Sequence, residues 1–243
     1  PILASNSGIL KMDKMKYFIS KALFTAVFLL FRLLTAAQGG NDRINSIDVL
    51  RYDFELTLSD STEQIRGNAT VQVKLLKAAS SLHLDLVATN AAGKGMKVSE
   101  IKSEGTALEF KHLGEDLEIL LPENQAADTE LKLVIAYSGI PADGLIISDS
   151  KEDGRSFFGD NWPNRAHHWL PTVDHPTDKA PVGFAVTAPA HFQIVANGKL
   201  VEQKVFPNGQ QISRWNNEAP LPTKVMVIGA ADFAIQSVGN VGN

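Results

Sequence analysis

Residues 155 to 180 read RSFFGDNWPNRAHHWLPTVDHPTDKA, and they gather more special residue types than any other part of the chain. The segment holds two of the three tryptophans and three of the six histidines, together with three prolines. Proline lacks a backbone donor and biases the residue before it toward extended geometry, which disfavours a regular helix, while the aromatic rings need apolar surroundings. We therefore expect an ordered, irregular connection.

The chain before this segment alternates between apolar and polar residues. Residues 52–58 place apolar side chains at every second position, and residues 69–75 do the same. A period of two is typical of strands with one buried face and predicts a hairpin that turns through residues 59–67. Further strands are indicated by Leu82, Leu84 and Leu86, by Leu117, Ile119 and Leu121, and by Leu131, Leu133, Ile135 and Tyr137.

Alternation resumes after residue 180 with Val182, Phe184 and Val186. Residues 192–195 are predicted to pair with residues 200–205 through an Asn197-Gly198 turn, and residues 225–228 are predicted to form a final buried strand. Short strands separated by turn residues, without a sustained helical period in the mature sequence, favour one all-β domain. We expect an antiparallel sandwich or open barrel, preceded by a hydrophobic N-terminal signal helix.

The first 37 residues have the pattern of untranslated read-through followed by a secretory signal peptide. The sequence opens on Pro1, basic residues precede an apolar run at residues 22–34, and small residues at 35–37 offer a cleavage site before Gln38. Residues 38–46 would then form a loose mature N-terminus, and the protein would be exported to the periplasm or outside the cell. The alternative is an uncleaved anchor, which would be the chain's only membrane contact, although the run before Arg32 is shorter than the roughly 20 residues that a spanning helix needs.

Composition limits the possible partners. The net charge is −4, from 23 basic and 27 acidic residues, so there is no electrostatic reason to expect nucleic acid. The chain contains no cysteine, which excludes disulfides and thiolate metal sites.

Three ordered motifs resemble one known family. The pattern W-L-P-x-x-D-H-P-x-D-K-A occupies residues 169–180, V-A-N-G-K-L follows at 195–200, and the chain's first strands carry D-V-L-R-Y-D-F-E-L at 48–56 and I-R-G at 65–67. Together they resemble the N-terminal β-domain of the aminopeptidase N-type zinc metallopeptidases, the gluzincin aminopeptidases. The resemblance implies a saddle-like β-domain over residues 47–236. Residues 237–243 would begin a linker to a missing catalytic domain.

That resemblance implies the substrate-side domain of a secreted zinc aminopeptidase, truncated before its catalytic domain. The family's zinc motif H-E-x-x-H is missing, since no His-Glu pair occurs in the sequence, and so is G-x-M-E-N. We therefore expect no cofactor in this chain, with zinc implied for the missing domain, and no peptidase activity from the chain alone. The expected partners are that domain and a peptide substrate. The alternative is a stand-alone secreted β-sandwich binding module.

The resemblance also suggests substrate-binding residues. Asp160 and Asn161 stand near the place where the family holds the free amino group of its substrate. From the residues themselves, Arg165, Asp174 and Lys179 are expected to form ion pairs that pin the segment, with substrate contact as the alternative. His167, His168 and His175 suggest a metal site, but neighbours in an extended segment point to opposite sides, so hydrogen-bonded histidines are preferred.

Overall fold

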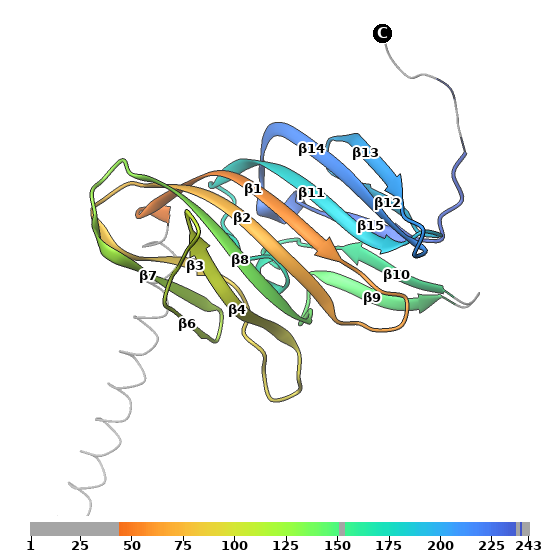
Figure 1. The fold of residues 1–243 in the computed structure, drawn as a ribbon, viewed down its shortest axis with the longest axis horizontal. Coiled ribbons are helices and arrows are strands. Elements are labelled where there is room, and N and C mark those ends of the chain that lie inside the picture. Colours follow the sequence, from red (N-terminus) through yellow and green to blue (C-terminus); the bar gives the residue numbers. More distant parts are fainter. Residues whose placement is uncertain (1–43, 151–153, 237–238, 240–243) are drawn as a thin grey trace, which may run out of the picture. The chain divides into compact units, whose positions relative to one another are not determined.

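The computed structural model describes residues 44–150, 154–236 and 239 of the chain (Figure 1). The predicted leader, the first part of the loose N-terminus and nearly all of the predicted linker lie outside the described residues. Within them, the chain forms fifteen strands and two short 3-10 helices. The described part contains no helix with the length and apolar character needed to cross a membrane.

The largest sheet has eight strands in the order β13-β14-β11-β1-β2-β8-β4-β5. Its strands are β1 (Ile47–Thr57), β2 (Ile65–Leu75), β4 (Gly95–Ser103), β5 (Thr106–Ala107), β8 (Glu130–Ile140), β11 (Lys179–Pro189), β13 (Lys199–Val205) and β14 (Gln210–Pro222). The order starts at β13 and ends at β5, so the sheet is not closed into a barrel. The expected all-β sandwich is confirmed, with the sheets left open.

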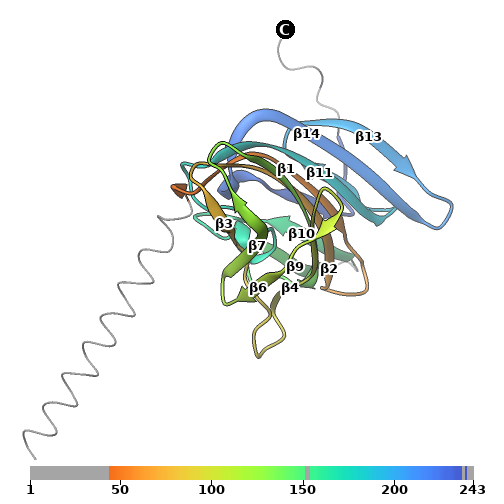
Figure 2. The same ribbon diagram turned by 60° about the vertical axis from the view of Figure 1, so that its left-hand side comes forward.

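Two smaller sheets lie against the large one, at different ends of it (Figures 1 and 2). One has the order β12-β15-β10-β9 and the other the order β3-β7-β6. Their strands are β3 (Ala79–Asp85), β6 (Phe110–Leu113), β7 (Asp116–Gln125), β9 (Leu145–Ser150), β10 (Gly154–Gly159), β12 (Gln193–Ala196) and β15 (Ile228–Ala231). Buried side chains from all three sheets form one apolar cluster, which includes Phe54, Leu84 and Phe157.

The predicted alternation sets the buried face of the large sheet. β1 and β2 form the expected antiparallel hairpin, in which Phe54 lies opposite Ala69 and Tyr52 opposite Val71. All four of these side chains are buried. A strand with period-two apolar residues turns one row toward the core, and these strands follow that rule.

The structure differs from the expectation in three places, two in strand pairing and one in where the last strand begins. β1 and β11 pair in parallel, so the large sheet is mixed and not purely antiparallel. β12 pairs with β15 and β13 with β14, so the Asn197-Gly198 turn does not join a hairpin. Residues 223–225 form a 3-10 helix, η2 (Thr223–Val225), and the last strand begins at Ile228.

The two differences in strand pairing arise because contacts between distant segments decide which strands are neighbours. A parallel pair needs a long crossover connection, and here the residues between β1 and β11, which include β2 to β10, supply it. Local alternation predicts that a strand exists, but the pairing of β12 with β15 is decided by burial shared between segments that are distant in sequence.

Candidate functional site in the connecting loop

The segment from 160 to 178 joins β10 to β11, and we call it the connecting loop. It carries η1 (Ala166–His168), the first of the two 3-10 helices in the described chain, and is otherwise irregular but largely buried, as expected. Of its flanking and internal aromatic residues, Phe157 and Trp169 are fully buried in the core. Phe158 and Trp162 are instead 59% and 60% exposed. The buried rings of Phe157 and Trp169 therefore anchor this part of the chain in the core, while the rings of Phe158 and Trp162 lie at the surface.

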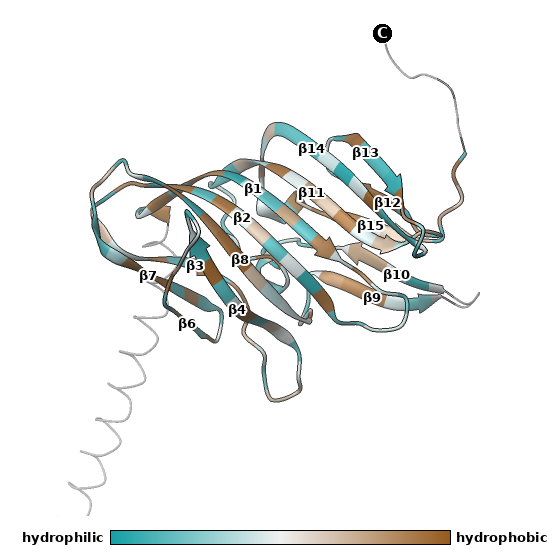
Figure 3. Cartoon of the chain, viewed as in Figure 1, coloured by the Kyte–Doolittle hydropathy of each residue, from teal (hydrophilic) through white to brown (hydrophobic). Residues whose placement is uncertain are grey.

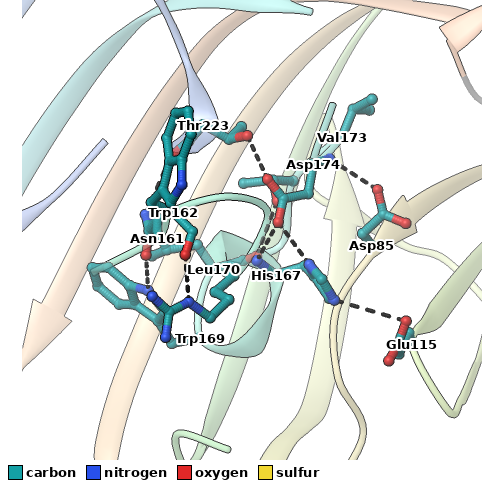
Figure 4. Close-up of polar contacts among 12 residues, drawn as sticks. Asp85, Glu115, Asn161, Trp162, His167, Trp169, Leu170, Val173, Asp174 and Thr223 are labelled. Atoms are coloured by element: carbon teal, nitrogen blue, oxygen red, sulfur yellow. Dashed lines mark hydrogen bonds and ion pairs between the residues drawn. The ribbon is translucent and has the colours of Figure 1, made fainter. Parts of the chain in front are cut away.

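Asn161 fastens the connecting loop to η2 (Figure 4). Its side-chain Nδ2 donates to the backbone oxygens of Thr223 at 3.1 Å and Met226 at 2.7 Å. Its Oδ1 accepts a hydrogen bond from Trp169 Nε1 at 2.8 Å. Asn161 is buried, so both amide hydrogens and one acceptor site are used inside the protein. The expected contact between Asn161 and substrate stays a prediction.

Asp160 lies at the accessible end of the loop. Arg165 donates from Nη2 to Asp160 Oδ2 at 2.7 Å and from Nη1 to Asp143 Oδ1 at 3.3 Å. The same guanidinium donates from Nε to the backbone oxygen of Trp162 at 2.6 Å. The expected ion pairing of Arg165 is confirmed, and it fixes the loop through three acceptors.

Asp174 is held inside the loop by His167 and Thr223. His167 Nδ1 lies 2.6 Å from Asp174 Oδ2, and Thr223 Oγ1 donates to Asp174 Oδ1 at 2.6 Å. Burial alone would raise the pKa of Asp174, but the hydrogen bonds from His167 and Thr223 outweigh it and hold that pKa below its ordinary value. Lys179 is exposed at the start of β11. Asp174 therefore has its expected ion-pair partner in His167 and not in Lys179, which alternation turns away from the core.

The two adjacent histidines lie together and do not point to opposite sides. Their ring centroids are 4.7 Å apart, because residues 166–168 form a 3-10 turn where extended backbone was expected. His167 Nε2 also lies 3.8 Å from Glu115 Oε2. His168 Nδ1 is buried without a hydrogen-bond partner, and burial followed by the neighbouring His167 lowers the pKa of His168.

The connecting loop does not fit a zinc site. Across the ranges that the structure describes, no group of three or more His, Cys, Asp or Glu residues is placed to hold a metal ion. His167 Nδ1 is already engaged by Asp174, so the expected hydrogen bonding is found for His167, whereas His168 Nδ1 lies buried without a partner.

Sequence reasoning missed several residues that define the site. Thr223 and Lys224 come from η2, where Lys224 Nζ lies 4.4 Å from the centroid of the Trp162 ring. Tyr52 of β1 accepts a hydrogen bond from the backbone N–H of Val173 at 2.9 Å. The sequence offered one signal for the contacts of η2: Thr223 and Lys224 are the two polar residues in the otherwise apolar run of residues 219–231.

The fold and the loop together match a known family. The peptidase M1 N-terminal domain family matches residues 49–225. The chain belongs to this family. As a member, it is 25% identical over 195 residues to leucyl aminopeptidase of Saccharolobus solfataricus (strain ATCC 35092 / DSM 1617 / JCM 11322 / P2), covering 77% of this chain and 22% of that protein.

Solved structures of M1 enzymes share the fold. The M1 zinc metallopeptidase from Deinococcus radiodurans has 26% sequence identity and a TM-score of 0.64, with coverage of 77% of this chain and 42% of that one. A mutant of that enzyme has been solved with a Tyr-Ser-Ala substrate bound. A two-domain M1 zinc metallopeptidase mutant bound to L-tryptophan shows 26% identity and a TM-score of 0.64, with coverage of 76% and 42%. The chain thus spans less than half the length of these relatives.

Proposed function

We propose that this chain is the N-terminal, substrate-side domain of an exported zinc-dependent aminopeptidase, which removes N-terminal residues from peptides. The family match over residues 49–225 carries the proposal. Support comes from the relative named leucyl aminopeptidase and from the Deinococcus enzyme that was solved with a Tyr-Ser-Ala substrate. Zinc and the groups that cleave the peptide bond are assigned to a catalytic domain outside this sequence.

The proposed role of the connecting loop is to bind and orient the substrate. The side chain of Asp160 is 38% exposed, and its carboxylate has acceptor capacity beyond the bond from Arg165. A carboxylate held in place by a guanidinium can accept a charge-assisted hydrogen bond from the ammonium group of a peptide. Asn161 contributes by holding the neighbouring Asp160 and Trp162 in place.

Export of the protein is the second part of the proposal. It is supported by the basic residues, the apolar run at 22–34 and the small residues at 35–37. Mass spectrometry of the mature protein should find an N-terminus at or near Gln38. A mature chain that still begins upstream of Met15 would contradict export by cleavage.

The function is tested on the natural full-length gene product with aminoacyl p-nitroanilides. We expect hydrolysis that is lost on chelation of zinc. Asp160→Asn should raise KM by roughly tenfold, which is the loss expected for one charge-assisted hydrogen bond. Asp149→Asn is a matched control, because Asp149 is also an accessible carboxylate paired with an arginine, Arg155, at 3.1 Å. A gene product without aminopeptidase activity would favour the stand-alone binding module.

A further inference from the structure

The strand β13 forms a free edge of the large sheet. It pairs with β14 on one side and stands at the end of the strand order, so its other side meets no strand of the described chain (Figure 2). All seven of its residues are exposed. At the opposite edge of the same sheet, β5 contains only two residues. A free edge with the length of β13 is a template for pairing with a strand of another chain.

The side chains of β13 suit a partner strand. Leu200, Val201 and Val205 are 46%, 62% and 61% exposed. Between the two valines lie charges of both signs, Glu202 and Lys204, and β13 accordingly has both brown and teal segments in Figure 3. Lysine alone protects a free edge, because two copies of the edge bring like charges together. An acidic residue two positions away allows two copies to pair opposite charges instead.

The backbone groups of Gln203 and Val205 point to the free side of β13. At the end of this strand, the N–H of Phe206 donates to the backbone oxygen of Gln210 in β14 at 2.8 Å. The N–H and C=O groups of successive residues alternate in direction along a strand. Those of Lys204 therefore also turn toward β14, while those of Gln203 and Val205 turn away from it. Two copies of β13 can exchange hydrogen bonds at these two residues.

A two-fold axis limits the ways in which two copies of β13 can pair. In an antiparallel pair of identical strands, the axis passes through a residue that lies opposite its own copy. An axis at Glu202 or at Lys204 brings two like charges directly together, which is destabilising. An axis at Val205 runs the pairing into Pro207, which has no N–H to donate. An axis at Val201 falls on the bulge of β13, where the ladder is irregular.

An axis at Gln203 avoids all of these conflicts. Glu202 of each copy then lies opposite Lys204 of the other, and this pair occurs twice. Val205 comes to lie across from the bulge, beside the exposed Val201, and Gln203 exchanges both backbone hydrogen bonds with its own copy. We propose that β13 joins two copies of this protein in an antiparallel, two-fold dimer with its axis at Gln203, so that the two large sheets form one continuous sheet.

Sedimentation equilibrium tests the dimer. Residues 38–243 are suitable for this measurement, because all the described strands belong to one compact unit, Arg43–Asn243, and the apolar run at 22–34 is left out. One pair of strands is a small interface, so we expect weak association, with a Kd on the order of 100 μM. A chain that stays monomeric at millimolar concentration would overturn the inference.

Charge reversal tests the register. Glu202→Lys places lysine opposite lysine twice and should weaken association about tenfold or more. Loss of its exposed pair with Arg214 should hardly change the melting temperature. The double variant Glu202→Lys, Lys204→Glu exchanges the two charges and should restore association.

Glu100→Lys is the matched control for the charge reversal. Glu100 also lies two residues from a lysine, Lys102, at 2.7 Å, but on β4, which is paired on both sides. This variant should associate like the wild type. An equal loss in Glu100→Lys and Glu202→Lys, or a double variant that folds but does not regain association, would overturn the inference.

A single introduced cysteine gives a second readout, because the chain has none of its own. The Cα atoms of a hydrogen-bonded antiparallel pair lie about 5.5 Å apart, within the range that a disulfide spans. Under mild oxidation, Gln203→Cys should therefore form a covalent dimer. Val201→Cys should do so several-fold more slowly, since its two copies would lie about 13 Å apart along the strands. Equal rates for the two variants would rule out the axis at Gln203 and overturn the inference.

Discussion

Asn161 Oδ1 lies 2.8 Å from the indole nitrogen of Trp169, and this contact lies in the protein interior. The contact ties two parts of the connecting loop together. Asn161 also ties the loop to η2 and the residue after it, through the backbone oxygens of Thr223 and Met226. Because Trp169, Thr223 and Met226 are buried, water does not easily replace the Asn161 amide if it is removed.

Asn161→Ala should therefore destabilise the domain strongly. The change removes the Asn161 bonds to Trp169 Nε1 and to the oxygens of Met226 and Thr223, and Thr223 keeps only the bond from the Met226 N–H, at a cost of roughly 2–4 kcal/mol. Asn197→Ala is the control: Asn197 also bridges two backbone groups, those of Val225 and Val227, but at a half-buried position that water can reach. Urea unfolding of residues 1–243 should show a clearly smaller loss for Asn197→Ala. Similar midpoints for wild type and Asn161→Ala would mean that the amide serves the substrate and not the fold.

Asp178 should make stability fall as pH rises. Burial is the main cause that raises the pKa of this carboxyl to about 7, and the nearby charge of Asp48 adds to it. The hydrogen bond from the Val49 N–H opposes this shift, while the Asp178 Oδ2 atom has no hydrogen-bond partner. The native state thus binds the Asp178 proton more tightly than the unfolded state does, so protonation of Asp178 at low pH stabilises the folded domain. That contribution is lost between about pH 4 and pH 7, with an upper limit of about 4 kcal/mol.

Asp178→Asn, which mimics the neutral carboxyl, should be more stable than wild type at pH 8, with little difference at pH 4. Chemical unfolding at both values checks this. Asp149→Asn, at an exposed position, should show no such pH-dependent gain. A constant difference between Asp178→Asn and wild type across this range would contradict the raised pKa.

Gly198→Ala should cost more stability than a glycine substitution in an open turn. Gly198 has a φ of +88°, and a Cβ there would overlap the backbone oxygen of Asn216. Gly93 has a similar φ of +76° but nothing within 4 Å of its Cβ position. Backbone strain alone is expected to cost roughly 1 kcal/mol at Gly93, and the clash should at least double this at Gly198. Equal thermal shifts for the two alanine variants would show that β14 yields to the added methyl group.

The sequence predicted which face of each strand is buried better than it predicted which strands pair with one another. Tyr52 and Val71 are buried because period-two alternation is a local property, which a single strand displays by itself. The pairing of Ile194 with Ala230 joins segments far apart in the chain, and nothing local specifies it. The same limit applied to the site: Asn161 is 62 residues from Thr223, so its buried bonds could not be read from the loop. The motif at residues 169–180 did identify the family, because it combines several residue types in a fixed order.

Trp162→Ala should affect catalysis and leave the fold intact. The ring is 60% exposed and its described ring partner is Lys224, whose Nζ lies over its face at 4.4 Å. An exposed cation–π contact contributes only about 0.5–1 kcal/mol, so residues 1–243 should melt at nearly the same temperature. In the full-length enzyme, loss of a rigid aromatic wall beside Asp160 should raise KM for peptides several-fold. Trp162→Phe keeps an aromatic face and should restore most of the affinity, which a purely structural role would not require. Unchanged KM in the alanine variant would remove Trp162 from the substrate side of the domain.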